Sequence, residues 1–375
     1  GLGWDDAWDI TSRMFAYTNH TIMSEALEKW PEQLFIQILP RIYSIVKEIN
    51  ERFCAMVYQN FPQKRADIHK MAIIGYGQIA MAPLCIAGSY SINGVSMLHS
   101  KIIREETFKD YSDVYPSKFT NVTNGVTHRR WLMLSNPMLT DLISKRIGSE
   151  WISNPESLEL LKEHVNDTGL LDQFDEIKKH NKLRLAKYIK QTTGILVSED
   201  SIFDVQVKRL HEYKRQLMNV LRILYDYIQI IANPEKYRDL TPVTCIFAAK
   251  AAPGYNRAKT IIKLINDVAD KINNDSRVMD KIKVVFLENY SVSLAQMIFP
   301  ASDISQQIST ASKEASGTGN MKFMMNGALT LGTMDGANVE IFQSVGADNI
   351  YIFGYDANTV QQIYKTGQYD PIAYI

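Results

Sequence analysis

Residues 314–322 read Glu-Ala-Ser-Gly-Thr-Gly-Asn-Met-Lys, a strand-to-helix turn around which the predicted fold is built. Two glycines flank Thr318, so the backbone can turn sharply and direct its N–H groups inward. A helical run over 323–329 follows, and a helix N-terminus favours a phosphate. The turn therefore predicts a phosphate cradle formed by Gly317, Thr318 and Gly319.

Lys322 follows Gly319 closely and lies just inside the predicted helix. A phosphate cradle beside an amine suits an aldehyde cofactor that carries a phosphate. Pyridoxal 5'-phosphate (PLP), held as a Schiff base on Lys322, is that cofactor. The alternative is an ordinary turn with a surface lysine, because a glycine-rich loop is a weak signal by itself.

Short apolar runs alternate with helical patterns on both sides of this turn, from about residue 123 onward. The predicted strands are 202–207, 243–249, 282–287, 304–309, 329–333 and 350–353. The predicted helices are 129–146, 157–166, 171–191, 212–231, 255–272, 292–298 and 336–344. This order predicts an α/β fold with a doubly wound parallel sheet. Ligands of such sheets bind at the carboxyl ends of the strands.

The N-terminal third has a different pattern. Residues 4–60 carry apolar side chains at helical spacing, and Pro31 is expected in a first helical turn. Residues 69–110 place glycines among small apolar residues, which is typical of closely packed helices. Because strand-like alternation is almost absent, residues 1–122 are predicted to be helical. A chain of 375 residues fits two domains, or one and a part.

Four cations follow the predicted strand 202–207. They are Lys208 and Arg209 at the strand end, then Lys214 and Arg215 in the first turn of the next helix. Cations near a helix N-terminus oppose its dipole, so an anion between them would relieve the repulsion. A solvated basic edge is the alternative, but the strand-end position favours an anion site. His211, in the same turn, is expected to make a structural hydrogen bond.

Composition excludes several classes of function. Lysine and arginine together number 41, as do aspartate and glutamate, so no overall field favours nucleic acid or an anionic membrane. Cys54, Cys85 and Cys245 are far apart in apolar runs, which predicts reduced core thiols and no metal site. No apolar run could span a bilayer, and no signal-peptide pattern is found. A cytoplasmic protein is expected.

The segment 313–340, KEASGTGNMKFMMNGALTLGTMDGANVE, resembles the PLP-binding segment of the α-glucan (glycogen, starch, maltodextrin) phosphorylases nearly residue for residue. Other matching segments are AYTNHT (16–21), TNGVTHRRWL (123–132), FDVQVKRLHEYKRQL (203–217), AAKAAPGY (248–255), VVFLENYSVSLA (284–295) and SDISQQIST (302–310). They follow the family's order and span nearly the whole chain. The chain resembles a bacterial-type member of this family. Because family members are much longer, the chain is interpreted as an internal fragment.

The resemblance implies a two-domain glycosyltransferase fold of the GT-B type. Residues 1–122 would be the helical C-terminal part of the N-terminal catalytic domain, whose sheet would lie upstream. Residues 123–375 would be the PLP-binding, Rossmann-like C-terminal domain, truncated at its end. Apolar faces left uncovered by such a truncation would make the fragment self-associate.

The implied activity is phosphorolysis of terminal α-1,4-glucosidic bonds by inorganic phosphate, giving α-glucose 1-phosphate with retention. The cofactor phosphate would relay a proton to the substrate phosphate. The full-length protein would be a homodimer from a family with allosteric members, and the fragment itself would be inactive.

Individual residues take roles only through this resemblance. The implied cofactor contacts are Lys322, Gly317, Thr318, Gly319, Lys208, Tyr290 and Trp131. The implied catalytic residues are Lys208, Arg209 and Lys214. The implied sugar contacts are Glu314, Tyr213, Asn124 and His20, the last through its backbone. Without the family, Tyr290 and Trp131 would be structural aromatics and Glu314 an ordinary acid near backbone dipoles.

Three positions depart from the family's pattern. His128 stands where proline is common, Pro83 where histidine is common, and Ser291 where animal members have arginine. Two other functions remain open: a nucleotide-sugar-binding module without PLP, and a PLP enzyme that acts on amino acids. The cationic cluster together with Glu314 favours a phosphorylase over both.

Overall fold

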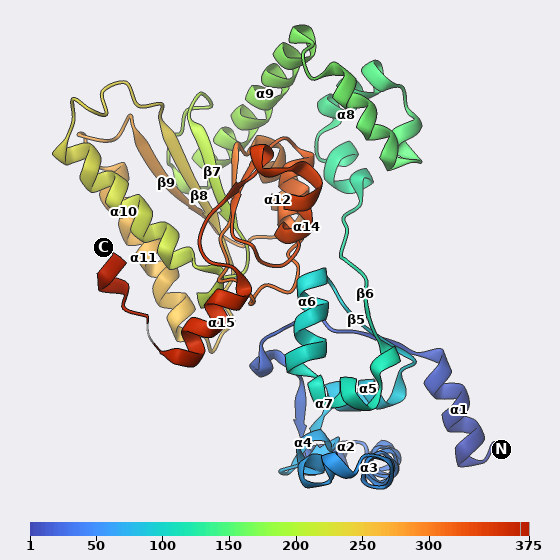
Figure 1. The fold of residues 1–375 in the computed structure, drawn as a ribbon. Coiled ribbons are helices and arrows are strands. Elements are labelled where there is room, and N and C mark those ends of the chain that lie inside the picture. Colours follow the sequence, from blue (N-terminus) through green and yellow to red (C-terminus); the bar gives the residue numbers. More distant parts are fainter. Residues whose placement is uncertain (368, 375) are drawn as a thin grey trace.

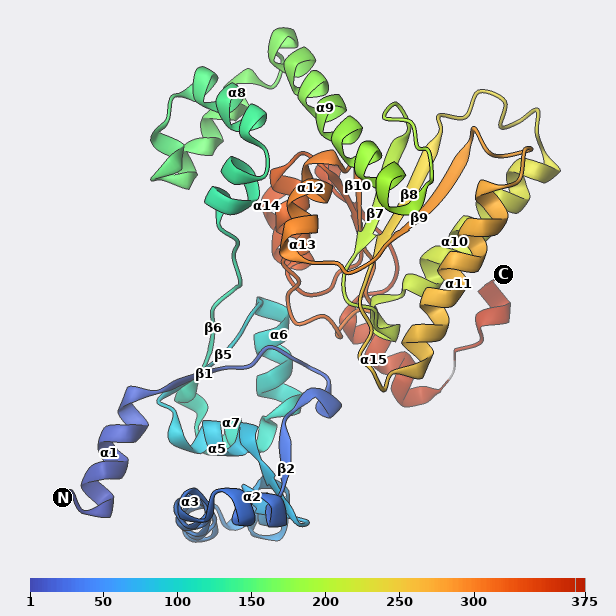
Figure 2. The same ribbon diagram turned by 180° about the vertical axis from the view of Figure 1, so that it is seen from behind.

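The computed structural model describes residues 1–367 and 369–374, and its largest element is a six-stranded parallel sheet (Figures 1 and 2). In spatial order the strands are β12 (Tyr351–Ile352), β11 (Leu329–Gly332), β10 (Ile304–Gln307), β7 (Ile202–Val207), β8 (Val243–Ala248) and β9 (Ile282–Leu287). Each predicted strand is present, with small differences only at the ends. The predicted α/β fold with a parallel sheet is therefore confirmed.

The strand order reverses beside β7. Strands β7, β8 and β9 follow one another toward one edge, and the chain then returns to place β10 on the other side of β7. In an open parallel sheet, ligands bind outside the carboxyl ends of the strands at such a reversal. Topology therefore directs attention to the turns that leave β7 and β10.

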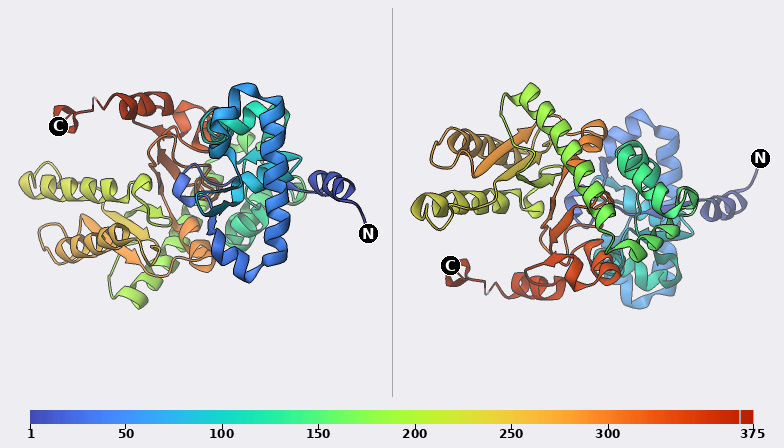
Figure 3. Two further views of the ribbon diagram at one scale, coloured as in Figure 1. Left: turned by 90° about the horizontal axis from the view of Figure 1, so that it is seen from below. Right: turned by 90° about the horizontal axis from the view of Figure 1, so that it is seen from above.

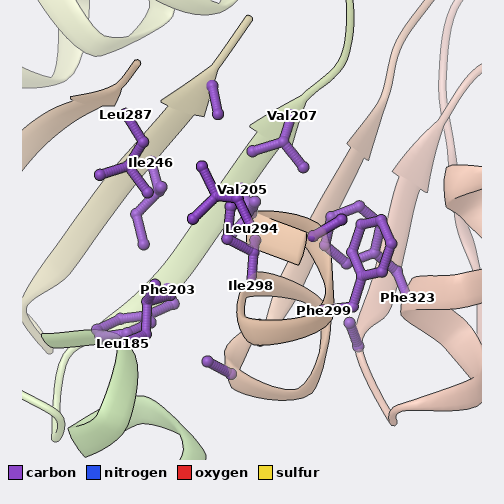
Figure 4. Packing of buried hydrophobic residues seen from close by; sticks show 14 of the residues in the cluster. Leu185, Phe203, Val205, Val207, Ile246, Leu287, Leu294, Ile298, Phe299 and Phe323 are labelled. Carbon is purple, nitrogen blue, oxygen red and sulfur yellow. The ribbon is translucent and has the colours of Figure 1, made fainter. Parts of the chain in front are cut away.

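Helices cover both faces of the sheet (Figure 3). One face carries α9 (Thr168–Thr193) and α12 (Val292–Ala301), and the other carries α10 (Gln216–Ala232) and α11 (Asn256–Asn273). Along β8, Ile246 joins the first core and Phe247 the second, as the two-residue period of a strand requires. Figure 4 shows the first core between β7, β8, β9 and α12.

The rest of this lobe consists of short helices. They are α8 (Pro137–Ile147), α13 (Gly319–Met325), α14 (Asn338–Val345) and α15 (Ala357–Thr366). The predicted helix over 129–146 begins instead as a wide π-helical turn, Arg129–Leu134, and the one over 157–166 is a 3-10 segment, Pro155–His164. An extended segment over 122–127 joins this lobe to the N-terminal one (Figure 1).

The N-terminal lobe contains more strand than predicted. Its helices are α1 (Trp4–Met14), α2 (Glu32–Ile38), α3 (Pro40–Asn60), α4 (Ile68–Met71), α5 (Met81–Gly88), α6 (Met97–Ile102) and α7 (Lys109–Val114). One three-stranded sheet is parallel: β1 (Ala16–Thr18), β5 (Ser91–Gly94) and β6 (Phe119–Asn121). The other is antiparallel: β2 (Lys29–Pro31), β4 (Gln78–Ala80) and β3 (Ile74–Gly75).

The prediction of an almost purely helical N-terminal region is therefore wrong. Its strands are two to four residues long, too short for an alternating pattern to stand out. Pro31 ends β2 and precedes α2 instead of lying in its first turn. Two three-stranded sheets lie within this region, although the resemblance placed the sheet of its domain upstream.

The composition also predicted the absence of a membrane-spanning segment and reduced cysteine thiols. Within the described ranges, no helix combines the length and the apolar character that crossing a membrane requires. All three cysteines carry free thiols, with Cys245 buried and the other two half-buried.

Candidate active site

The turns that leave β7 and β10 open into a cavity of about 750 Å³. Most of the predicted site residues line it: Trp131, Lys208, Arg209, Tyr213, Lys214, Tyr290, Glu314, Gly317, Thr318, Gly319 and Lys322. They come from segments far apart in the sequence, which the reversal of strand order brings to one edge of the sheet. The cavity therefore gathers an amine, a glycine-rich turn and a group of cations.

Lys322 lies on α13 and directs its amine toward the face of Trp131. Its Nζ is 4.0 Å from the centroid of the ring. Trp131 packs against Phe299 with centroids 5.3 Å apart, and Phe299 packs against Phe323 at 4.4 Å. Burial lowers the pKa of Lys322 from its usual value, which raises the fraction of neutral, nucleophilic amine near neutral pH.

Asp335, in the turn after β11, holds the loop that leads to Glu314. Its carboxylate accepts hydrogen bonds from Ser309 Oγ at 2.7 Å, and from the backbone N–H groups of Ser312 and Glu314 at 2.9 Å each. Burial raises the pKa of Asp335 to about 6. This contact was not found from sequence, although the segment that contains Asp335 was singled out.

Glycines let the loop that contains Ser316 and Gly317 pack closely against the turn that contains Gly336. Gly317 has a φ of +71° and Gly336 one of +52°, in the left-handed region that other residues rarely adopt. A Cβ atom at Gly336 would lie 2.5 Å from the carbonyl oxygen of Ser316. Helix α13 has only 7 residues, so an anion here would depend on loop N–H groups and nearby lysines more than on a helix dipole.

Two cations of the cavity, Lys208 and Lys214, are already engaged with polar partners. Lys208 donates to Gln307 Oε1 at 2.9 Å, and its burial, with the repulsion of Lys214, lowers its pKa to about 8. Lys214 forms an ion pair with Glu314, whose carboxylate also accepts from the Tyr213 hydroxyl at 3.4 Å. Burial opposes the charge of Glu314, but Lys214 and Lys208 hold its pKa below the usual value.

Two arginines of the cluster differ from each other in position. Arg209 is exposed and lines the cavity. Arg215 donates instead to the backbone carbonyls of Ile308 at 2.6 Å and Ser309 at 3.4 Å. Lys214 and Arg215 also precede α10 instead of lying in its first turn, with Arg215 at a φ of +59°. That prediction was wrong because a 3-10 turn is inserted before the helix.

His211 does not make the expected hydrogen bond through Nδ1, which is buried and has no partner in the described part of the chain. Its ring packs between Tyr213, at 4.7 Å between centroids, and Tyr255, at 5.2 Å. Lys250 and Ala252 line the cavity beside it. Aromatic packing therefore replaces the predicted polar contact.

His20 and Asn124 are not among the residues that line this cavity. His20 is exposed, and the backbone N–H of Asn124 donates to the Val95 carbonyl at 2.9 Å. Thr21 was not predicted to line the cavity, although it ends the segment 16–21 that contains His20. Together with Met23, Glu25 and Ala26 it forms the N-terminal wall of the cavity. Buried His99 holds this wall through the carbonyl of Thr21 at 3.2 Å.

The three departures from the family's pattern each have a local structure. His128 is buried, with Nε2 at 2.8 Å from the Ile152 carbonyl oxygen and its ring 5.9 Å from Trp151. Ser291 caps α12, since its Oγ accepts the N–H of Leu294 at 3.3 Å. Pro83 lies in the first turn of α5, where a missing N–H costs little.

Comparison with known proteins supports what this geometry indicates. The family model described as carbohydrate phosphorylase matches residues 1–375. The chain belongs to this family. Over 98% of its length it is 53% identical to glycogen phosphorylase of Bacillus subtilis, 48% to the muscle form of Rattus norvegicus and 47% to the liver form of Homo sapiens. The chain spans only 46%, 44% and 43% of the length of these relatives.

Proposed function

We propose that this protein, as part of a complete phosphorylase, cleaves terminal α-1,4-glucosidic bonds of glycogen or maltodextrin with inorganic phosphate. The product would be α-glucose 1-phosphate, with retained configuration. The observation that carries the proposal is the meeting of Lys322, the glycine-rich turn, and the Lys208 and Lys214 amines in one cavity. Membership of the family supports it.

The residues of the cavity fit PLP as the cofactor. Lys322 offers an amine of lowered pKa against an aromatic wall, which suits covalent attachment of an aldehyde. Gly317, Thr318 and Gly319, together with Lys208, would hold the phosphate. When bound, PLP would supply a phosphate monoester whose second pKa, about 6, suits proton exchange near neutrality. Tyr290 would pack beside it.

The substrate half of the cavity would be formed by the remaining polar groups. Arg209 and Lys214 would bind the substrate phosphate, because charge-assisted hydrogen bonds to phosphate are strong and both side chains line the cavity. The carboxylate of Glu314 and the hydroxyl of Tyr213 would contact sugar hydroxyls. Lys208 and Lys214 would offset the repulsion between two neighbouring phosphates.

The first test is the near-ultraviolet and visible absorbance of the purified protein incubated with PLP, before and after borohydride, with peptide mass mapping. We expect a reduced pyridoxyl adduct on Lys322, absent from Lys322→Arg and retained in the matched control Lys313→Arg. A colourless protein that a nucleotide sugar stabilises against heat would contradict the proposal and favour a nucleotide-sugar-binding module.

Several finer features belong to the same proposal. The six-stranded sheet would be the second domain of a GT-B-type fold, with the boundary between the two domains near residue 123. The complete protein would act as a cytoplasmic homodimer on soluble glucan. Analytical ultracentrifugation of the complete protein tests the dimer, since a monomer at working concentrations would contradict it.

A further inference from the structure

Three buried asparagines form a chain of hydrogen bonds behind the candidate active site. Asn181 on α9 donates through Nδ2 to Asn136 Oδ1 at 3.1 Å, and Asn136 donates through Nδ2 to Asn326 Oδ1 at 3.1 Å. The exposed fractions of Asn181, Asn136 and Asn326 are 3%, 2% and 0%. Polar groups this deeply buried are costly unless they are paired, and here each amide is paired with the next.

The last amide of the chain contacts the two residues that form the aromatic–amine pair. Asn326 Nδ2 donates to the backbone carbonyl of Trp131 at 2.7 Å and to that of Lys322 at 3.0 Å. Trp131 belongs to the π-helical turn and Lys322 to α13, and the Lys322 Nζ lies 4.0 Å from the centroid of the Trp131 ring. One side chain therefore fixes the distance between the two backbones that carry the pair.

The chain of hydrogen bonds also has a direction. The amide oxygens of Asn136 and Asn326 each accept from the asparagine before them, so the NH₂ groups of Asn181 and Asn136 must point onward and Asn326 must present donors to the two carbonyls. Reversing any one amide would place donor against donor or acceptor against acceptor. Lys178, which is not part of this chain of asparagines, also holds Asn326, because its ammonium donates to the Asn326 backbone carbonyl at 2.9 Å.

We propose that Asn181, Asn136 and Asn326 act as a positioning relay that holds the Lys322 amine against Trp131. Its use rests on the proposed attachment of PLP to Lys322, since an amine held in one orientation meets an incoming aldehyde at a fixed angle. None of the three asparagines lines the cavity, so each acts through Lys322 and Trp131.

The test is the reactivity of Lys322 in the cofactor-free protein, measured by trace labelling with acetic anhydride over a pH series and peptide mass spectrometry. Burial lowers the pKa of Lys322, so a displaced amine that gains water has a higher pKa. We expect Asn326→Ala to reduce labelling near neutral pH by about threefold, which corresponds to a rise of about half a pKa unit.

Two further variants separate positioning from a general loss of stability. Asn181→Leu, at the far end of the relay, should change the pKa of Lys322 in the same direction, and Asn136→Ala should add nothing to Asn326→Ala. The control is Asn273→Ala on α11, whose amide bonds the backbone of Val284 far from the cavity. It should lower the melting temperature and leave the labelling of Lys322 unchanged.

An unchanged pKa of Lys322 in a folded Asn326→Ala or Asn181→Leu variant would overturn the relay. Because acetic anhydride needs no cofactor, this outcome is distinct from failure of the proposed function, which would appear as a wild-type protein that forms no PLP adduct. Where the adduct forms, its rate of formation with added PLP should fall in Asn326→Ala and remain unchanged in Asn273→Ala.

Discussion

Replacing Lys214 by methionine should destabilise the folded protein strongly, because it leaves the carboxylate of Glu314 buried without its cation. The side chains of the pair are only 15% and 17% exposed, so water and salt screen their attraction weakly. At an effective dielectric constant of about 20, opposite charges about 3 Å apart attract each other by about 5.5 kcal/mol. Measured costs of breaking a buried pair are about 3–5 kcal/mol.

The local partners of Glu314 favour the lower end of that range. In Lys214→Met the carboxylate keeps the Tyr213 hydroxyl, at 3.4 Å, and the charge of Lys208. We therefore expect a loss of about 3 kcal/mol in the free energy of unfolding at neutral pH. Lys214→Met combined with Glu314→Gln should recover most of it, because the buried carboxylate is then removed together with its cation.

The loss should also depend on pH. In the wild type the pKa of Glu314 is lowered in the folded state, so its contribution is present above the unfolded pKa and is lost as pH falls through the folded one. Without Lys214, burial dominates and raises that pKa, so protonation at acid pH relieves the variant. The difference between the two proteins should shrink as pH falls toward 4.

Urea unfolding followed by both tryptophan fluorescence and far-ultraviolet circular dichroism measures these differences, and coincident transitions would justify a two-state treatment. Lys263→Met is the matched control, since its pair with Asp267 is 73% and 57% exposed and should contribute less than about 1 kcal/mol. A loss in Lys214→Met no larger than in this control, or a loss in the double variant equal to the sum of the single losses, would contradict this prediction.

Three other predictions address the same cavity and its supports. First, inorganic phosphate should bind the cofactor-free protein less tightly as pH rises above about 8, by at most tenfold per pH unit. The reason is that Lys208 loses its proton near pH 8 in the free protein, whereas a bound anion favours the charged form. Calorimetric titration should show proton uptake that is absent from Lys208→Met, and an affinity that does not change with pH would count against the role of Lys208. Second, Gly336→Ala should be more destabilising than Gly346→Ala by about 1–3 kcal/mol. Both glycines have positive φ, but only at Gly336 would a Cβ meet the backbone of Ser316. Equal melting temperatures of the two variants would contradict this. Third, Ser291→Ala should cost about 1 kcal/mol through loss of the cap of α12, and Ser291→Asp should restore it; thermal unfolding of the three proteins checks both statements.

The sheet could be predicted from sequence because its strands are buried on both faces. Such strands appear as short, continuous apolar runs, and the runs that became β7 and β9 match the observed strands residue for residue. The strands of the N-terminal lobe are as short as two residues, as in β3, and give no comparable signal. Prediction therefore succeeded where burial fixed a whole segment and failed where a few backbone hydrogen bonds define a strand.

The features of the candidate site also divide into those that the sequence could predict and those that it could not. Local chemistry identified the residues that carry charge or a special backbone, since Lys208 directly follows β7 and Gly317 belongs to the glycine-rich turn before α13. It could not show that Lys214 is paired with Glu314, since 100 residues separate them and only the strand order brings them together. The contact between His211 and Tyr255 was missed for the same reason, although both flanking segments were recognised.

The different partners of the two lysines indicate an order of events at the cavity. Lys214 is neutralised by Glu314, whereas the described contact of Lys208 is with the uncharged amide oxygen of Gln307. An anion that enters therefore gains more from Lys208, because it need not compete with a carboxylate there. Binding at Lys214 requires Glu314 to share its cation, and a sugar hydroxyl that donates to Glu314 would reduce that competition. If the proposed function holds, sugar and the phosphate that binds at Lys214 should therefore bind cooperatively. Glu314→Gln should abolish this cooperativity and strengthen the binding of phosphate in the absence of sugar.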